Sequence, residues 1–329
     1  MHGRMPRREF LQGLGAAGAT AAAALPSIPG CASMDSPMKS PFRIAVINDE
    51  IGQDFGHVCE IAAKEFGMEW IELRGMWNKN LLKLDAKEVE EARRILEKNK
   101  LRVTDIASPL FKVDWPGAPK SKYSPKRDQF NADFTFEQQD EVLERSIELA
   151  KAFQTDRVRC FDFWRLDDQG PYRAAMNEKL RNAAEKAAKK DVILVLENEP
   201  ACNTATAAEA AKVLAAVTTS NLMLNWDPGN AAEHGEKPYP DGYDLLPKNR
   251  IGHCHCKDAV KKADGKGYAW AAMGQGIIDW AGQFRALKRD DYHLAVSLET
   301  HWRGAGTPEE STRQSWAGMK KALQEAGAI

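Results

Sequence analysis

The sequence lacks a long apolar run, an excess of basic residues and a cysteine pattern typical of disulfide-rich domains. A membrane-spanning helix needs about 20 mainly apolar residues, and no stretch of this chain reaches that length. The formal net charge is −1, which does not favour a nucleic-acid partner. The 329 residues are 43% hydrophobic and 28% charged, a composition typical of a globular protein with a sizeable core.

Two catalytic motifs are also missing. No G-x-G-x-x-G follows the first strand-like run, which argues against a dinucleotide-binding fold. No G-x-S-x-G elbow is present, so a serine nucleophile of that type is not expected.

The cysteines indicate free, buried thiols rather than bridges. Cys254 and Cys256 alternate with His253 and His255, so on a strand the two pairs face opposite sides of the sheet. We expect the cysteines to face the helices and the histidines to face inward. The alternative is a Cys/His zinc knuckle, but no second pair with suitable spacing completes four ligands.

The N-terminal segment differs from the rest of the chain. Arg7-Arg8, then Phe10-Leu11 and a Gly/Ala-rich run, resemble a twin-arginine export signal. We expect a signal peptide over residues 1–33 and a linker over 34–41, the alternative being a short amphipathic or disordered N-terminus. Cleavage near Ser33 would give a periplasmic protein, whereas acylation of Cys31 would give a membrane-anchored lipoprotein.

From residue 42 to residue 329 the chain alternates between short apolar runs and helix-like segments. The predicted strands are Phe42–Ile47, Met68–Leu73, Leu101–Ile106, Arg157–Phe163, Val192–Leu196, Leu222–Trp226, Ile251–His255 and Leu294–Leu298. The predicted helices are His57–Phe66, Ala86–Lys98, Phe136–Phe153, Tyr172–Lys189, Ala207–Val217, Ile278–Lys288 and Glu309–Glu325. Eight strands that alternate with helices predict an α/β fold, a single (β/α)₈ TIM barrel. A long loop with Pro116, Pro119 and Pro125 interrupts the alternation once.

Four residues of metal-ligand type stand at the ends of four successive predicted strands: Glu197, Asp227, His255 and Glu299. Taken singly, Glu197 could be a strand-end carboxylate bound to backbone amides, and Asp227 could start an Asp-Pro-Gly turn. Because the C-terminal ends of barrel strands converge, the four together predict one divalent-metal centre. His255 is nearer the rim than His253, which we expect to pack behind it.

Several motifs together resemble the xylose-isomerase-like superfamily, the sugar phosphate isomerase/epimerase family. They are Leu-Glu-Asn-Glu at residues 196–199, Asn-Trp-Asp-Pro-Gly-Asn at 225–230, His-x-Lys-Asp at 255–258, Gly-x-Gly at 274–276 and Ser-Leu-Glu-Thr-His at 297–301. The resemblance implies one Mn²⁺, Mg²⁺, Co²⁺ or Zn²⁺ ion, with Glu197, Asp227, His255 and Glu299 as ligands. It places Lys257 and Asn230 among substrate-contacting residues, and His301, close behind Glu299, is assigned to the same group. Glu199 departs from the pattern, since many relatives have His there, and this difference concerns the substrate more than the metal.

The implied reaction is isomerisation or epimerisation of a sugar or keto-sugar. A divalent ion chelated by carbonyl and hydroxyl oxygens would stabilise a metal-bound enediolate. The resemblance gives Glu197 and Glu299 the proton-transfer roles. Three alternatives stay open: a lyase or hydrolase of oxidised (3-keto) glycosides, a non-catalytic sugar-binding barrel, and a DNA-repair endonuclease, which would need more histidines than the seven present. An oligomer is compatible with the sequence.

Overall fold

The computed structural model describes residues 39–124 and 132–329. The expected signal peptide, Cys31, most of the expected linker and Pro125 lie outside the described residues. Among the residues described, no helix is long and apolar enough to span a membrane.

Eight parallel strands form the central sheet, in the order β1-β12-β9-β8-β7-β6-β5-β2. Their bounds are β1 Arg43–Val46, β2 Trp70–Leu73, β5 Arg102–Leu110, β6 Arg157–Cys160, β7 Ile193–Glu197, β8 Leu222–Trp226, β9 Ile251–Cys256 and β12 Ala295–Leu298. A parallel bridge between Ile47 and Glu72 joins the two edges, so the sheet closes on itself. The predicted (β/α)₈ TIM barrel is confirmed.

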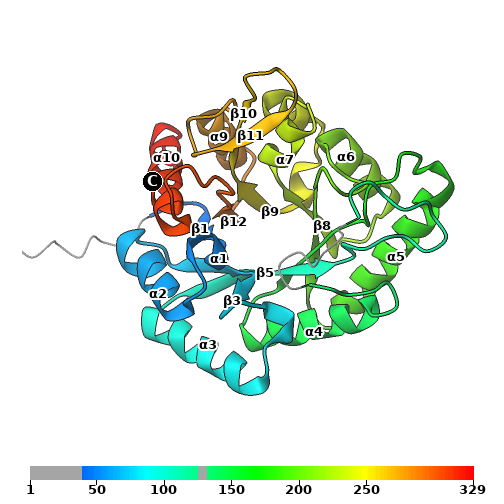
Figure 1. Cartoon of the computed structure of the whole chain (residues 1–329), viewed down its shortest axis with the longest axis horizontal. Coiled ribbons are helices and arrows are strands. Elements are labelled where there is room, and N and C mark those ends of the chain that lie inside the picture. The colour runs from blue at the N-terminus through cyan, green and yellow to red at the C-terminus, as the bar shows by residue number, and fades with distance from the viewer. Residues whose placement is uncertain (1–38, 125–131) are drawn as a thin grey trace, which may run out of the picture. The chain divides into compact units, whose positions relative to one another are not determined.

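Helices surround the barrel (Figure 1). The longer ones are α3 Ala86–Asn99, α4 Gln139–Ala152, α5 Gly170–Ala188, α6 Ala207–Ala216, α9 Trp280–Arg289 and α10 Pro308–Glu325. The shorter ones are α1 Asn48–Ile51, α2 Phe55–Glu60, α7 Pro228–Glu233 and α8 Tyr243–Leu245. Capping residues set several starts: Asp85 and Glu88 form a capping box on α3, and Thr206 and Glu209 form one on α6.

Some elements differ from the sequence prediction. The helix expected over His57–Phe66 is α2 followed by a π-helical turn at Ile61–Glu65. Strand β5 runs past Ile106 to Leu110 because a register shift lets its end pair with β6. Two hairpins were not expected, namely β3 Gly75–Met76 with β4 Lys79–Asn80, and β10 Asp258–Lys261 with β11 Tyr268–Ala271.

The two faces of the sheet differ in polarity. Cys254 and Cys256 belong to the apolar core, and all the cysteines in the described part of the chain are free and buried, as expected. The barrel interior instead holds buried polar side chains, among them Glu72, Asp105, Arg157, Asn225 and His253. A buried polar interior requires partners, and these are found at the C-terminal ends of the strands.

Candidate metal centre

Four neighbouring strands, β7, β8, β9 and β12, bring the expected ligands together. Glu197 ends β7, His255 lies in β9, and Asp227 and Glu299 directly follow β8 and β12. All four side chains are buried, and one ligand atom from each lies within 4.8 Å of the others. Nδ1 of His255 faces Glu197 at 3.4 Å, Asp227 at 3.7 Å and Glu299 at 3.3 Å. The structure therefore places three carboxylates around one imidazole nitrogen.

The orientation of His255 is fixed from behind. Its Nε2 lies 3.0 Å from Oε1 of Glu72, in β2. Because a carboxylate only accepts hydrogen bonds, Nε2 donates to Glu72, and Nδ1 is the nitrogen that would bind a metal ion after losing its own proton. His253 lies behind His255, where Asn225 contacts both rings, and Nε2 of His253 is 3.5 Å from Glu72. Burial lowers the pKa of His253 to about 3, so this ring is neutral.

Asp227 has two roles, one per oxygen. Oδ1 accepts from the backbone N–H of Asn230 and caps α7, which is the turn chemistry of Asp-Pro-Gly. Oδ2 lies 2.8 Å from Nζ of Lys257. Lys257 reaches it by crossing over Gly229, where an added Cβ would lie 2.5 Å from Cγ of the lysine. The glycine of this motif therefore makes room for the lysine.

Glu197 is held by two donors. Asn230 donates from Nδ2 to Oε1 at 3.1 Å, and Nη1 of Arg159 lies 3.1 Å from Oε2. Burial alone would raise the pKa of Glu197, but the His255 and Arg159 charges lower it below the ordinary value. Glu197 is therefore an anion in the folded protein.

Glu299 is also surrounded by nitrogen atoms of three side chains. Lys257 donates to Oε2 at 2.6 Å, and Nη1 of Arg74 donates to Oε1 at 2.8 Å. Nε2 of His301 lies 3.2 Å from the same Oε1. Burial alone would raise the pKa of Glu299, but Lys257, His301 and His255 hold it well below the ordinary value.

The donor set fits a divalent cation. Nδ1 of His255 is buried and has no hydrogen-bond partner among the described residues. Oε2 of Glu197 and Oδ2 of Asp227 are buried as well, and the cations next to them are Arg159 and Lys257. Burial alone would lower the pKa of His255, but the Glu72, Glu299 and Glu197 charges hold it well above the ordinary value, so a metal ion at Nδ1 would displace a proton. Three carboxylates and one imidazole suit Mn²⁺, Mg²⁺, Co²⁺ or Zn²⁺.

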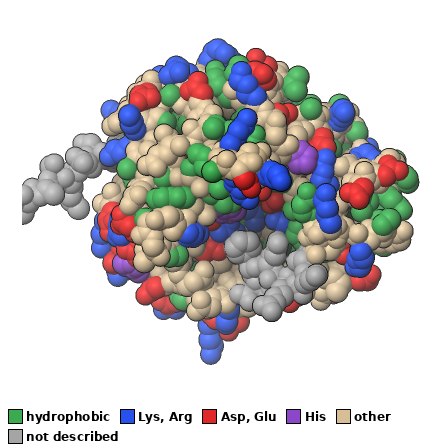
Figure 2. All heavy atoms as spheres, turned by 45° about the horizontal axis from the view of Figure 1, so that its top comes forward, with side chains coloured by type: hydrophobic (Ala, Val, Ile, Leu, Met, Phe, Trp, Pro, Cys, Tyr) green, Lys and Arg blue, Asp and Glu red, His purple; other side chains and the backbone are tan. Residues whose placement is uncertain are grey.

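A pocket of about 490 Å³ opens beside the centre. Figure 2 shows a hollow on this face of the molecule, with basic side chains in and beside it. Of the four clustered residues, only Glu197 and Glu299 line the pocket, together with Arg74 and Arg159. Asp227 and His255 lie behind them.

The expected substrate-contacting residues separate into two groups. His301 lines the pocket, with about a quarter of its side chain exposed (28%). Lys257 and Asn230 are almost fully buried at 1% and 2% exposure, and they contact the carboxylates instead of lining the pocket. On this geometry they position Asp227, Glu299 and Glu197.

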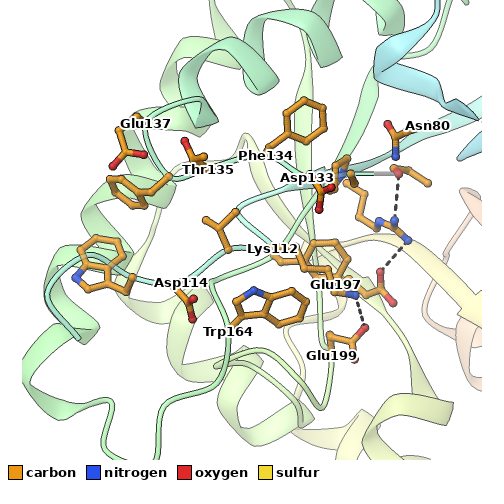
Figure 3. Close-up of a pocket in the computed structure, with 18 of the residues that line it drawn as sticks. Asn80, Lys112, Asp114, Asp133, Phe134, Thr135, Glu137, Trp164, Glu197 and Glu199 are labelled. Carbon is orange, nitrogen blue, oxygen red and sulfur yellow. Dashed lines mark hydrogen bonds and ion pairs between the residues drawn. The ribbon is translucent and has the colours of Figure 1, made fainter. Parts of the chain in front are cut away.

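Several functional candidates were missed in the sequence. Arg74 and Arg159 contact the two pocket carboxylates, and Glu72 orients His255. Each is a charged residue in or next to a buried strand, a signal that marks a satisfied polar site. Lys112 also lines the pocket and pairs with Glu199 at 2.9 Å (Figure 3). No spacing pattern points to Lys112.

Solved structures of similar fold include three with informative names. The "IOLI protein with a binding zinc atom" has a TM-score of 0.67 and 15% identity, with 89% of this chain and 99% of that chain covered. The probable 3-DHS dehydratase AsbF of Bacillus anthracis has a TM-score of 0.64 and 23% identity, with 85% of this chain and 98% of that chain covered. The 3-keto-D-glucoside 4-epimerase YcjR of E. coli has a TM-score of 0.61 and 17% identity, with 85% of this chain and 99% of that chain covered. At these identities the likeness is one of fold.

No curated protein sequence matches the chain. The family profile described as "Xylose isomerase-like TIM barrel" matches residues 61–322, which include all four clustered residues. The chain belongs to the xylose isomerase-like TIM barrel family.

Proposed function

We propose that the protein is a divalent-metal-dependent isomerase or epimerase that acts on a sugar or keto-sugar by proton transfer. One observation carries the proposal: of the four clustered side chains, the two glutamates, Glu197 and Glu299, are the ones that line the pocket. A carboxylate that faces the substrate is suited to accept or return a proton.

Glu197, Asp227, His255 and Glu299 would hold the metal ion. When bound, a divalent ion would polarise a substrate carbonyl and acidify the adjacent C–H. Zinc in one protein of similar fold, named above, supports this choice of cofactor.

The protein's own residues would handle the proton. Glu197 and Glu299 come from β7 and β12, which the sheet order separates by β8 and β9, so they approach the substrate from two sides. One removes the proton from the carbon next to the carbonyl, and the other returns one. Arg159 and Arg74, each bound to one of the glutamates, keep both carboxylates anionic and oriented. The epimerase and dehydratase names of similar structures are consistent with chemistry next to a carbonyl.

Deuterium exchange tests the proposal. Metal-loaded protein is incubated in D₂O with aldoses, ketoses and 3-keto-glycosides, and the sugars are read by NMR. We expect deuterium at the carbon next to the carbonyl of the substrate. Glu299→Gln should abolish it while the circular dichroism spectrum is kept, and the exposed Glu325→Gln serves as the control. Turnover without solvent deuterium would argue for a hydride shift or for hydrolysis.

A second candidate, elimination from an oxidised glycoside, is favoured by the Lys112–Glu199 pair. Burial alone would lower the pKa of Lys112, but Glu199 raises it, so the side chain is an ammonium that can donate. A glutamate of the centre would take the proton next to the carbonyl, and the C–O bond would break as a C=C bond forms. The electron pair would stay on the leaving oxygen, which would take a proton from Lys112.

Binding without exchange for every sugar tested would favour the third candidate, a non-catalytic sugar-binding barrel.

Export by the twin-arginine route also belongs to the proposal, on the basis of Arg7 and Arg8, with a lipid anchor at Cys31 as the alternative to cleavage.

A further inference from the structure

The pocket has two ends of different chemistry. Figure 3 shows Glu197, Lys112 and Glu199 close together, with Asp114 and Glu137 on the other side of the pocket. The far end is lined by residues 113–118 and 134–137, which lie in the long connection between β5 and α4. A volume of about 490 Å³ lies within the range of about 300–1,000 Å³ usual for small-molecule sites. The centre occupies one end of this space only.

Five aromatic side chains line the pocket, beside polar side chains of the connection between β5 and α4. Trp115, Phe134 and Phe136 are half-buried, whereas Phe161 and Trp164 are buried. Half-buried aromatic rings gathered in a concave surface indicate a binding site for an apolar group.

Trp115 is held in place from behind. Its ring lies edge-on against Phe136, with centroids 5.5 Å apart, and against the buried Phe163 at 4.7 Å. Phe163 in turn packs on Phe111 at 5.2 Å. Because a buried aromatic cluster supports the indole, this wall of the pocket is preorganised, which limits the entropy lost on binding.

The Lys112–Glu199 pair stands next to Glu197 of the candidate metal centre, on the path to the aromatic end (Figure 3). Nζ of Lys112 also lies 4.4 Å from the centroid of Phe161. The pocket thus combines a carboxylate end, a charged hydrogen-bonding pair and an aromatic end. A glycoside has the same sequence of parts: a sugar ring, a linking oxygen and an aglycone.

We infer that the aromatic end of the pocket is a subsite for a planar, apolar aglycone, and that the substrate is an aryl glycoside of an oxidised sugar. The inference rests on the proposed function. Since the anomeric carbon of a glycoside is blocked, the carbonyl that the mechanism needs must come from oxidation elsewhere on the ring. The competing occupant is a second sugar ring, whose hydroxyls would bond to Thr135 and Glu137 on the same lining, and the probes below separate the two.

Calorimetry on the metal-loaded protein tests the subsite with three probes: phenyl 3-keto-β-glucoside, methyl 3-keto-β-glucoside and 3-keto-cellobiose. The phenyl glycoside should bind about tenfold more tightly than the methyl glycoside, because a ring leaves water. Trp115→Ala should bring the ratio of the two dissociation constants close to one. Trp70→Ala, at the N-terminal end of strand β2, should keep the wild-type ratio.

The outcomes separate the subsite from the proposed function. Equal binding of the phenyl and methyl probes, an unchanged ratio in Trp115→Ala, or equal binding of the phenyl probe and 3-keto-cellobiose would each overturn the subsite. If Trp115→Ala does not fold, Phe134→Ser on the same lining gives the same test. Deuterium exchange into the methyl probe reports on the candidate centre alone. If exchange occurs but the phenyl and methyl probes bind with equal affinity, only the subsite is rejected. If the phenyl probe binds tenfold more tightly but no exchange occurs, only the proposed reaction is rejected.

Discussion

Nε2 of His255 lies 3.0 Å from Oε1 of Glu72, and this contact leaves Nδ1 facing the three carboxylates of the candidate centre. Glu72 lies on β2, on the other side of the barrel closure from the strands that carry the four clustered residues. Although burial alone would raise the pKa of Glu72, the adjacent His255 and His253 lower it to about 2. A charged carboxylate behind an imidazole strengthens it as a ligand.

Glu72→Gln should therefore weaken metal binding by about 10–100-fold, the usual effect of losing a carboxylate behind a ligating histidine. The measurement is competition against a chromophoric chelator. Glu69→Gln, three residues earlier and half exposed in an ion pair with Arg102, is the matched control. Equal affinities in Glu72→Gln and wild type would show that Glu72 does not orient the ligand.

Gly229→Ala should displace Lys257. The new methyl would lie 2.5 Å from Cγ and 3.1 Å from the backbone oxygen of Lys257, so the lysine must leave Asp227 and Glu299. Overpacking of this kind costs about 1–3 kcal/mol, measured as the free energy of unfolding in denaturant. Gly56→Ala in α2, where the added methyl meets no atom closer than 3.5 Å, should leave the stability unchanged or raise it. Equal stability of the two variants would contradict the packing argument.

Asp105 should make the protein less stable as the pH rises. Neither of its buried carboxylate oxygens has a hydrogen-bond partner among the described residues. Burial, and then the charge of Glu72, raise its pKa to about 8, from about 3.9 in an unfolded chain. The charged and titratable groups around it are Glu72, Arg159, His255 and Arg157. Because the folded state keeps the proton longer, this group lowers the free energy of unfolding progressively between about pH 4 and pH 8.

The Asp105→Asn variant removes this titration. Its stability relative to wild type should increase from pH 4 to pH 8, as followed by denaturant unfolding at each pH. The exposed Asp241→Asn should show no such trend. If the difference in free energy of unfolding between Asp105→Asn and wild type stays constant from pH 4 to pH 8, Asp105 is already ionised at pH 4 in the folded protein.

The barrel could be predicted from the sequence because its strands are short apolar runs at regular spacing. The grouping of Glu197, Asp227, His255 and Glu299 could be anticipated for a geometric reason: residues at the C-terminal ends of parallel strands meet. Glu72 and Arg159 carried a usable signal, since a charge inside a buried strand requires a partner.

The rest of the pocket could not be predicted in this way. Trp115, Phe134 and Phe136 lie in a long connection without helical or strand periodicity, so nothing in their spacing shows that they share a surface. Lys257 was expected to contact substrate, but its path across Gly229 to Asp227 depends on how α7 packs under β10. Both features are set by tertiary packing.

Export depends on Arg7 and Arg8 in our proposal. Replacing both by Lys should leave the precursor in the cytoplasm, as measured by fractionation and blotting. The matched control replaces Arg43 and Arg102, which lie on the described barrel. Normal export of the Lys variant would mean that the N-terminal segment is not a twin-arginine signal.

The metal content of protein purified without chelators tests the central claim most directly. We expect about one divalent ion per wild-type chain by elemental analysis, and a large loss in both Glu197→Gln and His255→Ala. Both variants should keep the wild-type circular dichroism spectrum. Full occupancy in both variants would contradict the assignment of Glu197, Asp227, His255 and Glu299 as a metal centre.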